Sequence, residues 1–259
     1  MSTRSPSVEL EGWSRSPFTA AGMTHDVYRK GTGPGVIVVH EIPGITPSVL
    51  AFAEEVVASG FTVVMPSLVG TPGRAPSGGY LASSALKVCI SREFTHWATG
   101  ATSPVIGWLR AVARWLHGEA GGPGVGAVGM CFSGGFALGM MVDDIMVAPV
   151  LSQPSLPFAA GRGAKAEVRG GDLNLSPDDA LMVVQRAEAG CEVLGLRFTG
   201  DALVGTRFDT LRSLLGERFI AVEFDSPHAK AHSVLTEDRM QEGVDRVLEF
   251  FRSKLLGAG

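Results

Sequence analysis

Short runs of apolar, largely β-branched residues recur along this chain of 259 residues, and stretches with helical spacing lie between them. Such a run suits a strand whose two faces are both buried, as in a parallel sheet. Parallel neighbours need a crossover connection, which a helix usually supplies. The pattern therefore predicts an α/β fold with strands at Val36–Val39, Phe61–Met65, Val125–Met130, Ile145–Val150, Val193–Phe198 and Phe219–Phe224.

The helices expected between these strands have one apolar face. The clearest follows Ser103-Pro104, an N-cap residue and a first-turn proline, and its apolar residues Val105, Trp108 and Val112 fall on one side. The N-terminal region before Val36 is expected to add short antiparallel edge strands. Further helices are predicted at Pro47–Ser59, Ser133–Val142, Pro177–Ala189, Val204–Leu215 and Arg239–Leu255.

Neither an internal repeat nor a low-complexity linker divides the chain, so residues 1–259 are predicted as a single domain. Residues 1–8 are expected to form a disordered tail. Two long segments, Leu68–Ser103 and Ser152–Ser176, do not fit the strand–helix rhythm. Because long loops in compact domains are often lids or pocket walls, residues 152–176 are predicted as an insertion near the pocket, with surface decoration as the alternative.

Composition and charge exclude several functional classes. The 22 Lys and Arg residues against 26 Asp and Glu residues leave a formal charge of −4, so no basic footprint predicts nucleic-acid binding. The most apolar region, Val125–Leu151, is interrupted by Ser133 and by Asp143-Asp144, which argues against a membrane span. The N-terminus has no apolar signal-peptide core, and the cysteines lack C-x-x-C spacing. These features predict a cytoplasmic protein without nucleic-acid or membrane partners; its oligomeric state is unknown.

The segment Val125–Gly135 predicts a nucleophile. A buried strand runs into small residues and then into a helix, which is the pattern of a nucleophile elbow with Cys131 in the place of the usual serine. Gly129 and Gly134 supply small residues that such a turn needs, and a helix N-terminus would favour the thiolate. Two alternatives are a buried structural cysteine and a second elbow in which Ser133 is the nucleophile.

An acid and a base follow in the order that α/β-hydrolases use. Asp201 follows the strand Val193–Phe198, so its carboxylate is expected at the carboxyl edge of the sheet, with a helix or turn cap as the alternative. The loop after the last strand contains His228 and His232. One of these two histidines is expected to be the general base.

Two motif matches are dismissed on mechanism. Gly124–Gly129 matches G-x-G-x-x-G, but it spans a predicted strand, where no helix N-terminus can receive a pyrophosphate. His40-Glu41 begins like H-E-x-x-H, but Gly44 stands where the second histidine should be. We therefore expect no cofactor and no metal.

With these residues in place, the chain resembles the dienelactone hydrolase family of the α/β-hydrolase superfamily, from about Gly35 to Leu255. In that family the elbow cysteine, the aspartate and the histidine before a serine form the triad, which implies Cys131, Asp201 and His232 rather than His228. Four motifs carry the resemblance: His40-Glu41-Ile42-Pro43-Gly44, Gly129-Met130-Cys131, Gly200-Asp201 and His232-Ser233.

The resemblance also implies roles for four further residues. Glu41 is implied to lie beside the thiol and to help form the reactive thiolate when substrate binds. The backbone amides of Ile42 and Phe132 are implied to form the oxyanion hole. Arg92 lies in a region where the family can supply an arginine that binds a substrate carboxylate, and a surface ion pair is the alternative.

Some positions depart from the family pattern. Ser133 and Ala231 stand where glycine is common, and Thr236 stands where chlorocatechol-pathway members place a basic residue that holds the substrate carboxylate. The resemblance therefore does not by itself imply dienelactone as the substrate.

The resulting prediction is a hydrolase of small-molecule esters or lactones that uses a Cys-His-Asp triad and an acyl-thioester intermediate. Activated acyl groups, such as enol lactones and aryl esters, are expected to react best because a thiolate is a good leaving group. The alternatives are a thioesterase or acyltransferase, and a catalytically silent binding protein with the hydrolase fold.

Overall fold

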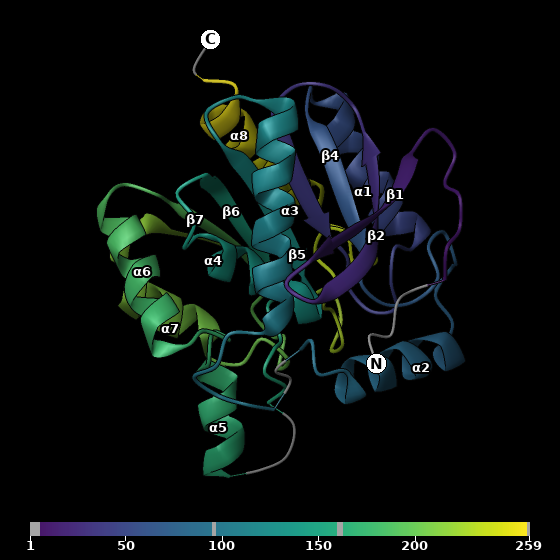
Figure 1. The fold of residues 1–259 in the computed structure, drawn as a ribbon. Helices are drawn as coiled ribbons and strands as arrows, with labels where there is room; N and C mark the ends of the chain where they lie inside the picture. Colours follow the sequence, from purple (N-terminus) through teal and green to yellow (C-terminus); the bar gives the residue numbers. More distant parts are fainter. Residues whose placement is uncertain (1–5, 95–96, 160–162, 258–259) are drawn as a thin grey trace.

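An eight-stranded sheet runs through residues 6–94, 97–159 and 163–257, the part of the chain that this computed structural model describes (Figure 1). The strand order is β1-β2-β4-β3-β5-β6-β7-β8. β1 pairs with β2 and β2 with β4 in antiparallel fashion, and the other neighbours are parallel. The strands are β1 Ser14–Ala20, β2 Met23–Lys30, β3 Gly35–Val39, β4 Thr62–Ser67, β5 Val125–Met130, β6 Met146–Ser152, β7 Val193–Phe198 and β8 Phe219–Phe224.

The parallel strands coincide with the apolar runs because both of their faces are buried. In β3, Ile37 and Val39 belong to one core cluster, whereas Val36 and Val38 belong to the other. Successive side chains of a strand point to opposite faces, so a continuous apolar run fills two cores at once. The predicted mostly parallel sheet and the antiparallel edge strands near the N-terminus are confirmed.

Helices cover both faces of the sheet (Figure 1). One core contains residues of α3, α4, α6 and α7, and the other contains residues of α1 and α8. α2 and α5 lie beyond the sheet, at the lower end of the view in Figure 1. The helices are α1 Pro47–Ala58, α2 Gly78–Ile90, α3 Pro104–Ala120, α4 Phe136–Met140, α5 Ala164–Gly171, α6 Pro177–Glu188, α7 Arg207–Leu215 and α8 Gln241–Leu255, with 3₁₀ turns η1 at Cys131–Ser133 and η2 at Gly216–Arg218.

Two predicted helices begin three residues later in the structure than the sequence predicts. α7 begins at Arg207 instead of Val204, because Gly205 has a φ of +60° and interrupts a right-handed helix. The helix expected at Ser133–Val142 is divided into η1 and α4, with the poor helix former glycine at positions 134 and 135 between them.

Two helices occur in segments that the sequence predicts as long loops. α2 exposes Leu86 and Ile90 to 61% and 64%, so its apolar residues do not mark a single buried face. In α5 only Gly170 is buried, which leaves no apolar stripe to recognise. Both helices flank the carboxyl edge of the sheet (Figure 1).

The N-terminal tail is partly attached to the sheet. Residues 1–5 lie outside the described residues, whereas the hydroxyl of Ser7 donates to Asp26 at 2.8 Å, and the hydroxyl of Tyr28 donates to the carbonyl oxygen of Val8. Ser7 and Val8 thus contact strand β2, and the disordered tail stays a prediction.

No helix within the described residues is long and apolar enough to cross a bilayer. Cys89, Cys131 and Cys191 are free thiols. The cytoplasmic location stays a prediction.

Candidate active site

Cys131 lies at the sharp turn from β5 into η1. Its φ is +56°, in the left-handed region that residues with a side chain rarely adopt. A Cβ at Gly129 would lie 2.0 Å from the carbonyl oxygen of Ser133, so only glycine fits there. A Cβ at Gly134 would lie 2.6 Å from the Cα of Pro154. This tight turn holds Cys131 at the carboxyl edge of the sheet.

The predicted helix-dipole contribution at Cys131 finds no support in this turn. Only the 3₁₀ turn η1 starts at Cys131, and α4 begins at Phe136 and is five residues long. A macrodipole needs a longer run of aligned peptides.

Ser133 points into the protein. Its hydroxyl accepts a hydrogen bond of 3.0 Å from the amide of Met130 and lies 3.1 Å and 3.0 Å from the carbonyl oxygens of Val39 and His40, to which it can donate. The residue is fully buried. This geometry favours a structural role for Ser133, which ties the turn to β3, over the alternative in which it is the nucleophile.

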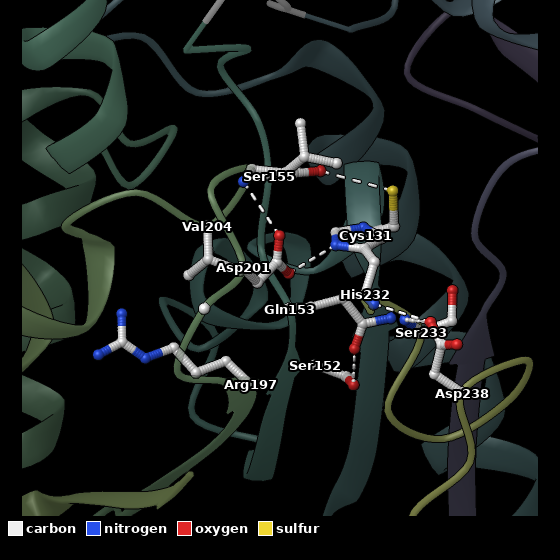
Figure 2. A network of polar contacts seen from close by, with 12 residues as sticks. Cys131, Ser152, Gln153, Ser155, Arg197, Asp201, Val204, His232, Ser233 and Asp238 are labelled. Carbon is white, nitrogen blue, oxygen red and sulfur yellow. Dashed lines mark hydrogen bonds and ion pairs between the residues drawn. The ribbon is translucent and has the colours of Figure 1, made fainter. Parts of the chain in front are cut away.

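Asp201 and His232 are hydrogen-bonded, with 2.6 Å between Oδ2 and Nδ1 (Figure 2). The other Asp201 oxygen accepts from the amide of Leu203 at 3.0 Å, so Asp201 both caps a turn and orients the imidazole. His228 lies elsewhere: its Nε2 is 2.8 Å from Asp238, and its side chain is 54% exposed. The structure therefore brings His232, and not His228, to Asp201.

The remaining imidazole nitrogen, Nε2 of His232, is buried and has no hydrogen-bond partner among the described residues. Cys131 lies beside the His232 ring (Figure 2). Burial lowers the pKa of His232, but the charge of Cys131 and the hydrogen bond to Asp201 outweigh burial and raise that pKa to about 11. At neutral pH the raised pKa of His232 favours its imidazolium form.

Glu41 is buried and faces the loop that carries the histidine. Its carboxylate accepts hydrogen bonds from Ser233 at 2.8 Å, from Gln153 at 3.3 Å and from the hydroxyl of Thr236. Burial raises the pKa of Glu41, and the hydrogen bonds from Thr236 and Ser233 oppose that rise. Among the described residues no hydrogen bond joins Glu41 to Cys131, so the predicted place beside the thiol is not seen as a direct contact.

The two amides predicted for the oxyanion hole are free to donate. Neither the amide of Ile42 nor that of Phe132 makes a hydrogen bond within the described part of the chain. His40 holds the loop before Ile42, since its Nε2 accepts from the amide of Leu68 at 3.0 Å and its Nδ1 donates to the carbonyl oxygen of Glu41 at 2.8 Å. Burial lowers the pKa of His40 to about 4, so this histidine is neutral.

The substrate-binding role of Arg92 stays a prediction. The residue follows α2 and is exposed, and its side chain makes no ion pair or hydrogen bond with the described residues. Neither the predicted carboxylate-binding role nor the alternative surface ion pair is seen. The nearby Phe94 instead packs edge-to-face on Phe132, with 5.5 Å between ring centroids.

A cavity of about 390 Å³ lies next to the thiol. Ser155 lines it, and the Ser155 hydroxyl is 3.5 Å from Sγ of Cys131 (Figure 2). The predicted pocket walls, residues 68–103 and 152–176, both contribute to the lining. The sequence marked the segments but not the individual wall residues. The walls include Cys89, Trp97, Ser155, Phe158, Ala202 and Leu203.

Arg207 fixes the walls of this cavity from within the protein. Its guanidinium is fully buried and donates to backbone carbonyl oxygens of three segments that are distant in sequence. These are residues 156–157, residues 169–172 and residues 203–204. The sequence analysis missed Arg207, because an arginine in the first turn of an amphipathic helix is ordinarily a surface residue.

In the segment Gly124–Gly129, which matches G-x-G-x-x-G, Gly126 has a structural role. Gly126 lies in β5, where a Cβ would meet the ring of Phe251 at 3.0 Å, so this glycine allows α8 to pack closely. Within the described residues no group of three or more His, Cys, Asp or Glu side chains is arranged to hold a metal ion.

The sequence of residues 23–152 matches the model of the dienelactone hydrolase family, and this range is half of the chain. The chain belongs to the dienelactone hydrolase family. The matched range contains Glu41 and Cys131, whereas Asp201 and His232 follow it. The prediction of a carboxylic-ester or lactone hydrolase of this family is confirmed at that level. No curated protein matches the chain significantly.

Solved structures share the fold at low sequence identity. A protein described as a dienelactone hydrolase from Klebsiella pneumoniae is 20% identical over 92% of this chain and 97% of its own, with a TM-score of 0.60. A Pyrococcus furiosus esterase is 13% identical over 94% and 91%, with a TM-score of 0.59. A 2,6-dihydroxy-pseudo-oxynicotine hydrolase is 13% identical over 95% and 69%, with a TM-score of 0.62. The predicted α/β-hydrolase fold is confirmed.

Proposed function

We propose that this member of the dienelactone hydrolase family cleaves esters or lactones with Cys131 as nucleophile, His232 as general acid and base, and Asp201 as the residue that orients His232. The observation that carries the proposal is the 2.6 Å hydrogen bond between Asp201 and His232 next to a cysteine at the strained turn. A nucleophile, a base and an orienting acid in this relation are the minimum for acyl transfer.

The first step moves the acyl group to sulfur. The Cys131 thiolate attacks the carbonyl carbon, and the resulting oxyanion accepts hydrogen bonds from the free amides of Ile42 and Phe132. When the tetrahedral intermediate collapses, the bond to the leaving oxygen breaks and the His232 imidazolium gives that oxygen its proton. The products are an alcohol, or the opened chain of a lactone, and an acyl-thioester on Cys131.

The second step returns the enzyme to its starting state. Neutral His232 takes a proton from water while the water oxygen attacks the thioester carbon, and Asp201 stabilises the imidazolium that forms. Collapse of this intermediate breaks the carbon–sulfur bond. The carboxylic acid leaves, and the thiolate–imidazolium pair is restored.

This chemistry favours activated substrates. A thiolate is a better leaving group than an alkoxide, so the first intermediate of an ordinary alkyl ester reverts to substrate more often than it proceeds. Aryl esters and enol lactones avoid this reversal because their leaving oxygens are weakly basic.

The proposal is tested by trapping the acyl-enzyme. A 4-nitrophenyl ester should release a burst of nitrophenol that is stoichiometric with enzyme, and mass spectrometry after acid quenching should find the acyl group on the peptide that contains Cys131. Absence of both burst and turnover would favour a silent binding protein instead. Transfer of the acyl group to an added alcohol in preference to water would indicate an acyltransferase.

A further inference from the structure

Two hollows flank the short segment Ala202–Leu203 beside the triad. The first is the 390 Å³ cavity next to Ser155, and we call it the acyl cavity. The second, of about 320 Å³, has Asp201, Lys230 and His232 among its walls.

Cleavage at Cys131 leaves the acyl group on the sulfur, so the acyl group belongs to the hollow that reaches this sulfur. The acyl cavity contains no part of His232, but its wall residue Ser155 touches the sulfur that takes up the acyl group.

The acyl cavity has an apolar lining. No acidic or basic side chain is among its walls within the described residues. Trp97 and Phe158 pack edge-to-face there, with 6.1 Å between centroids. Trp97 and Leu203 are 49% and 52% exposed, and exposed apolar side chains around a cavity are typical of a site that an apolar ligand covers.

Two cationic side chains near the acyl cavity, Lys165 and Arg169, are not among its walls. Lys165 and Arg169 line a separate hollow of about 460 Å³ that shares only Trp97 with the acyl cavity. Arg169 lies over the Trp97 ring at 5.4 Å and donates to the carbonyl oxygen of Phe158 at 2.8 Å. Among the described residues, no cation is therefore placed to pair with a carboxylate inside the acyl cavity, whereas its apolar walls favour an apolar group.

We propose that the acyl half of the substrate is uncharged and apolar, with an aryl or short alkyl group held against Trp97 and Phe158. This inference rests on the cysteine hydrolase function proposed above and adds the substrate class. A substrate with a carboxylate on its acyl side is accordingly selected against.

Three esters with one leaving group test this selection. They are 4-nitrophenyl benzoate, its 4-carboxy derivative, and the methyl ester of that derivative, which is larger but neutral. We expect kcat/KM, corrected for spontaneous hydrolysis, to fall by roughly 100-fold for the 4-carboxy ester and far less for its methyl ester. Equal values for the benzoate and the 4-carboxy ester would overturn the inference, and so would equal losses for both derivatives, since size would then explain the effect.

A charge placed in the wall provides a second test. Cys89 lines only the acyl cavity among these hollows, and it lies on the surface helix α2. Cys89→Arg should reduce the ratio of kcat/KM between the benzoate and the 4-carboxy ester by about tenfold, because the new cation pairs with the carboxylate. Cys89→Met, which is long but neutral, should keep this ratio. If Cys89→Arg is folded and leaves this ratio of kcat/KM unchanged, the cavity does not bind the acyl group.

Failure of this inference can be distinguished from failure of the proposed function. If wild type cleaves the benzoate ester and Cys131→Ala does not, the function stands whatever the 4-carboxy ester does. If neither protein cleaves any of the three esters, the function is wrong, and the substrate class falls with it.

Discussion

The carboxylate of Glu41 accepts a hydrogen bond of 2.8 Å from the hydroxyl of Ser233, the residue that follows His232. The loop after β3 and the loop after β8 are thereby joined inside the protein. Glu41 can therefore act on the site in two ways, through its charge or through the position of the loop that carries His232.

Replacing Glu41 separates these two roles. Glu41→Gln should slow acylation and change the pH dependence of Cys131 alkylation, because the buried negative charge near His232 is lost. Folding should be largely retained, since the hydroxyls of Ser233 and Thr236 can donate to a carboxamide oxygen. The measurements are stopped-flow nitrophenol release and iodoacetamide alkylation as a function of pH.

Thr236→Val is the matched control, because it removes one hydrogen bond to Glu41 and leaves the charge. If it reproduces the effects of Glu41→Gln, the role of Glu41 is positional. If wild type and Glu41→Gln have superimposable alkylation profiles and equal turnover, Glu41 is no part of the mechanism.

The nucleophile is tested by two alanine variants two residues apart. Cys131→Ala should abolish turnover. Ser133→Ala should keep most of the turnover of the folded enzyme but lower its free energy of unfolding by about 1–2 kcal/mol, since the buried amide of Met130 loses a partner. Kinetics and chemical denaturation measure the two effects. A folded but inactive Ser133→Ala would show that the elbow is wrongly placed.

The two histidines of the last loop should differ sharply. His232→Ala is expected to reduce kcat/KM by roughly 1000-fold or more, as loss of a triad base does in other hydrolases. His228→Ala should have a mild effect, because the His228 side chain is 54% exposed and pairs with Asp238 instead of Asp201. Comparable losses in both variants would refute the assignment of the base.

Asp238 should make stability depend on pH in the acid range. Burial raises the pKa of Asp238, but hydrogen bonds from the His232 amide, the His228 ring and the Ser233 amide outweigh burial and bring that pKa below its ordinary value of 3.8. The resulting stabilisation is therefore present above the unfolded-state pKa and lost as pH falls through the lower folded-state pKa.

Wild type should exceed Asp238→Asn in free energy of unfolding by about 1–2 kcal/mol near neutral pH, and this excess should shrink as the pH approaches about 3. Urea denaturation at several pH values measures the excess. An excess that stayed constant or grew in acid would contradict the assigned role of Asp238.

Of the substitutions in these predictions, the replacement of Arg207 should lower the free energy of unfolding most. Arg207→Met removes the guanidinium that donates to backbone carbonyl oxygens of residues 156–157, 169 and 172, and 203–204, so we expect the free energy of unfolding to fall by more than about 3 kcal/mol. Arg218→Met is the control, because Arg218 is exposed and should change stability by less than about 0.5 kcal/mol. Similar denaturation midpoints for the two variants would contradict this role of Arg207.

The sequence by itself determined the features that depend on local pattern. The parallel strands β5, β7 and β8 coincide with their predicted bounds. β5 is buried throughout and is therefore apolar throughout, whereas the edge strand β8 keeps a largely apolar run although Glu223 is exposed. Cys131 and Asp201 could be predicted at the carboxyl edge, since each follows a recognisable strand. Helix starts were less predictable where a glycine such as Gly205 interrupts the chain.

Only the tertiary structure decided the relationships across the chain. Whether His228 or His232 pairs with Asp201 depends on how a loop without periodicity crosses the sheet edge. The partners of Glu41 and the backbone groups bound by Arg207 lie dozens of residues away in sequence. Periodicity reports which side of an element is buried, but not which distant side chains meet there, so these contacts exist only once the whole chain has packed.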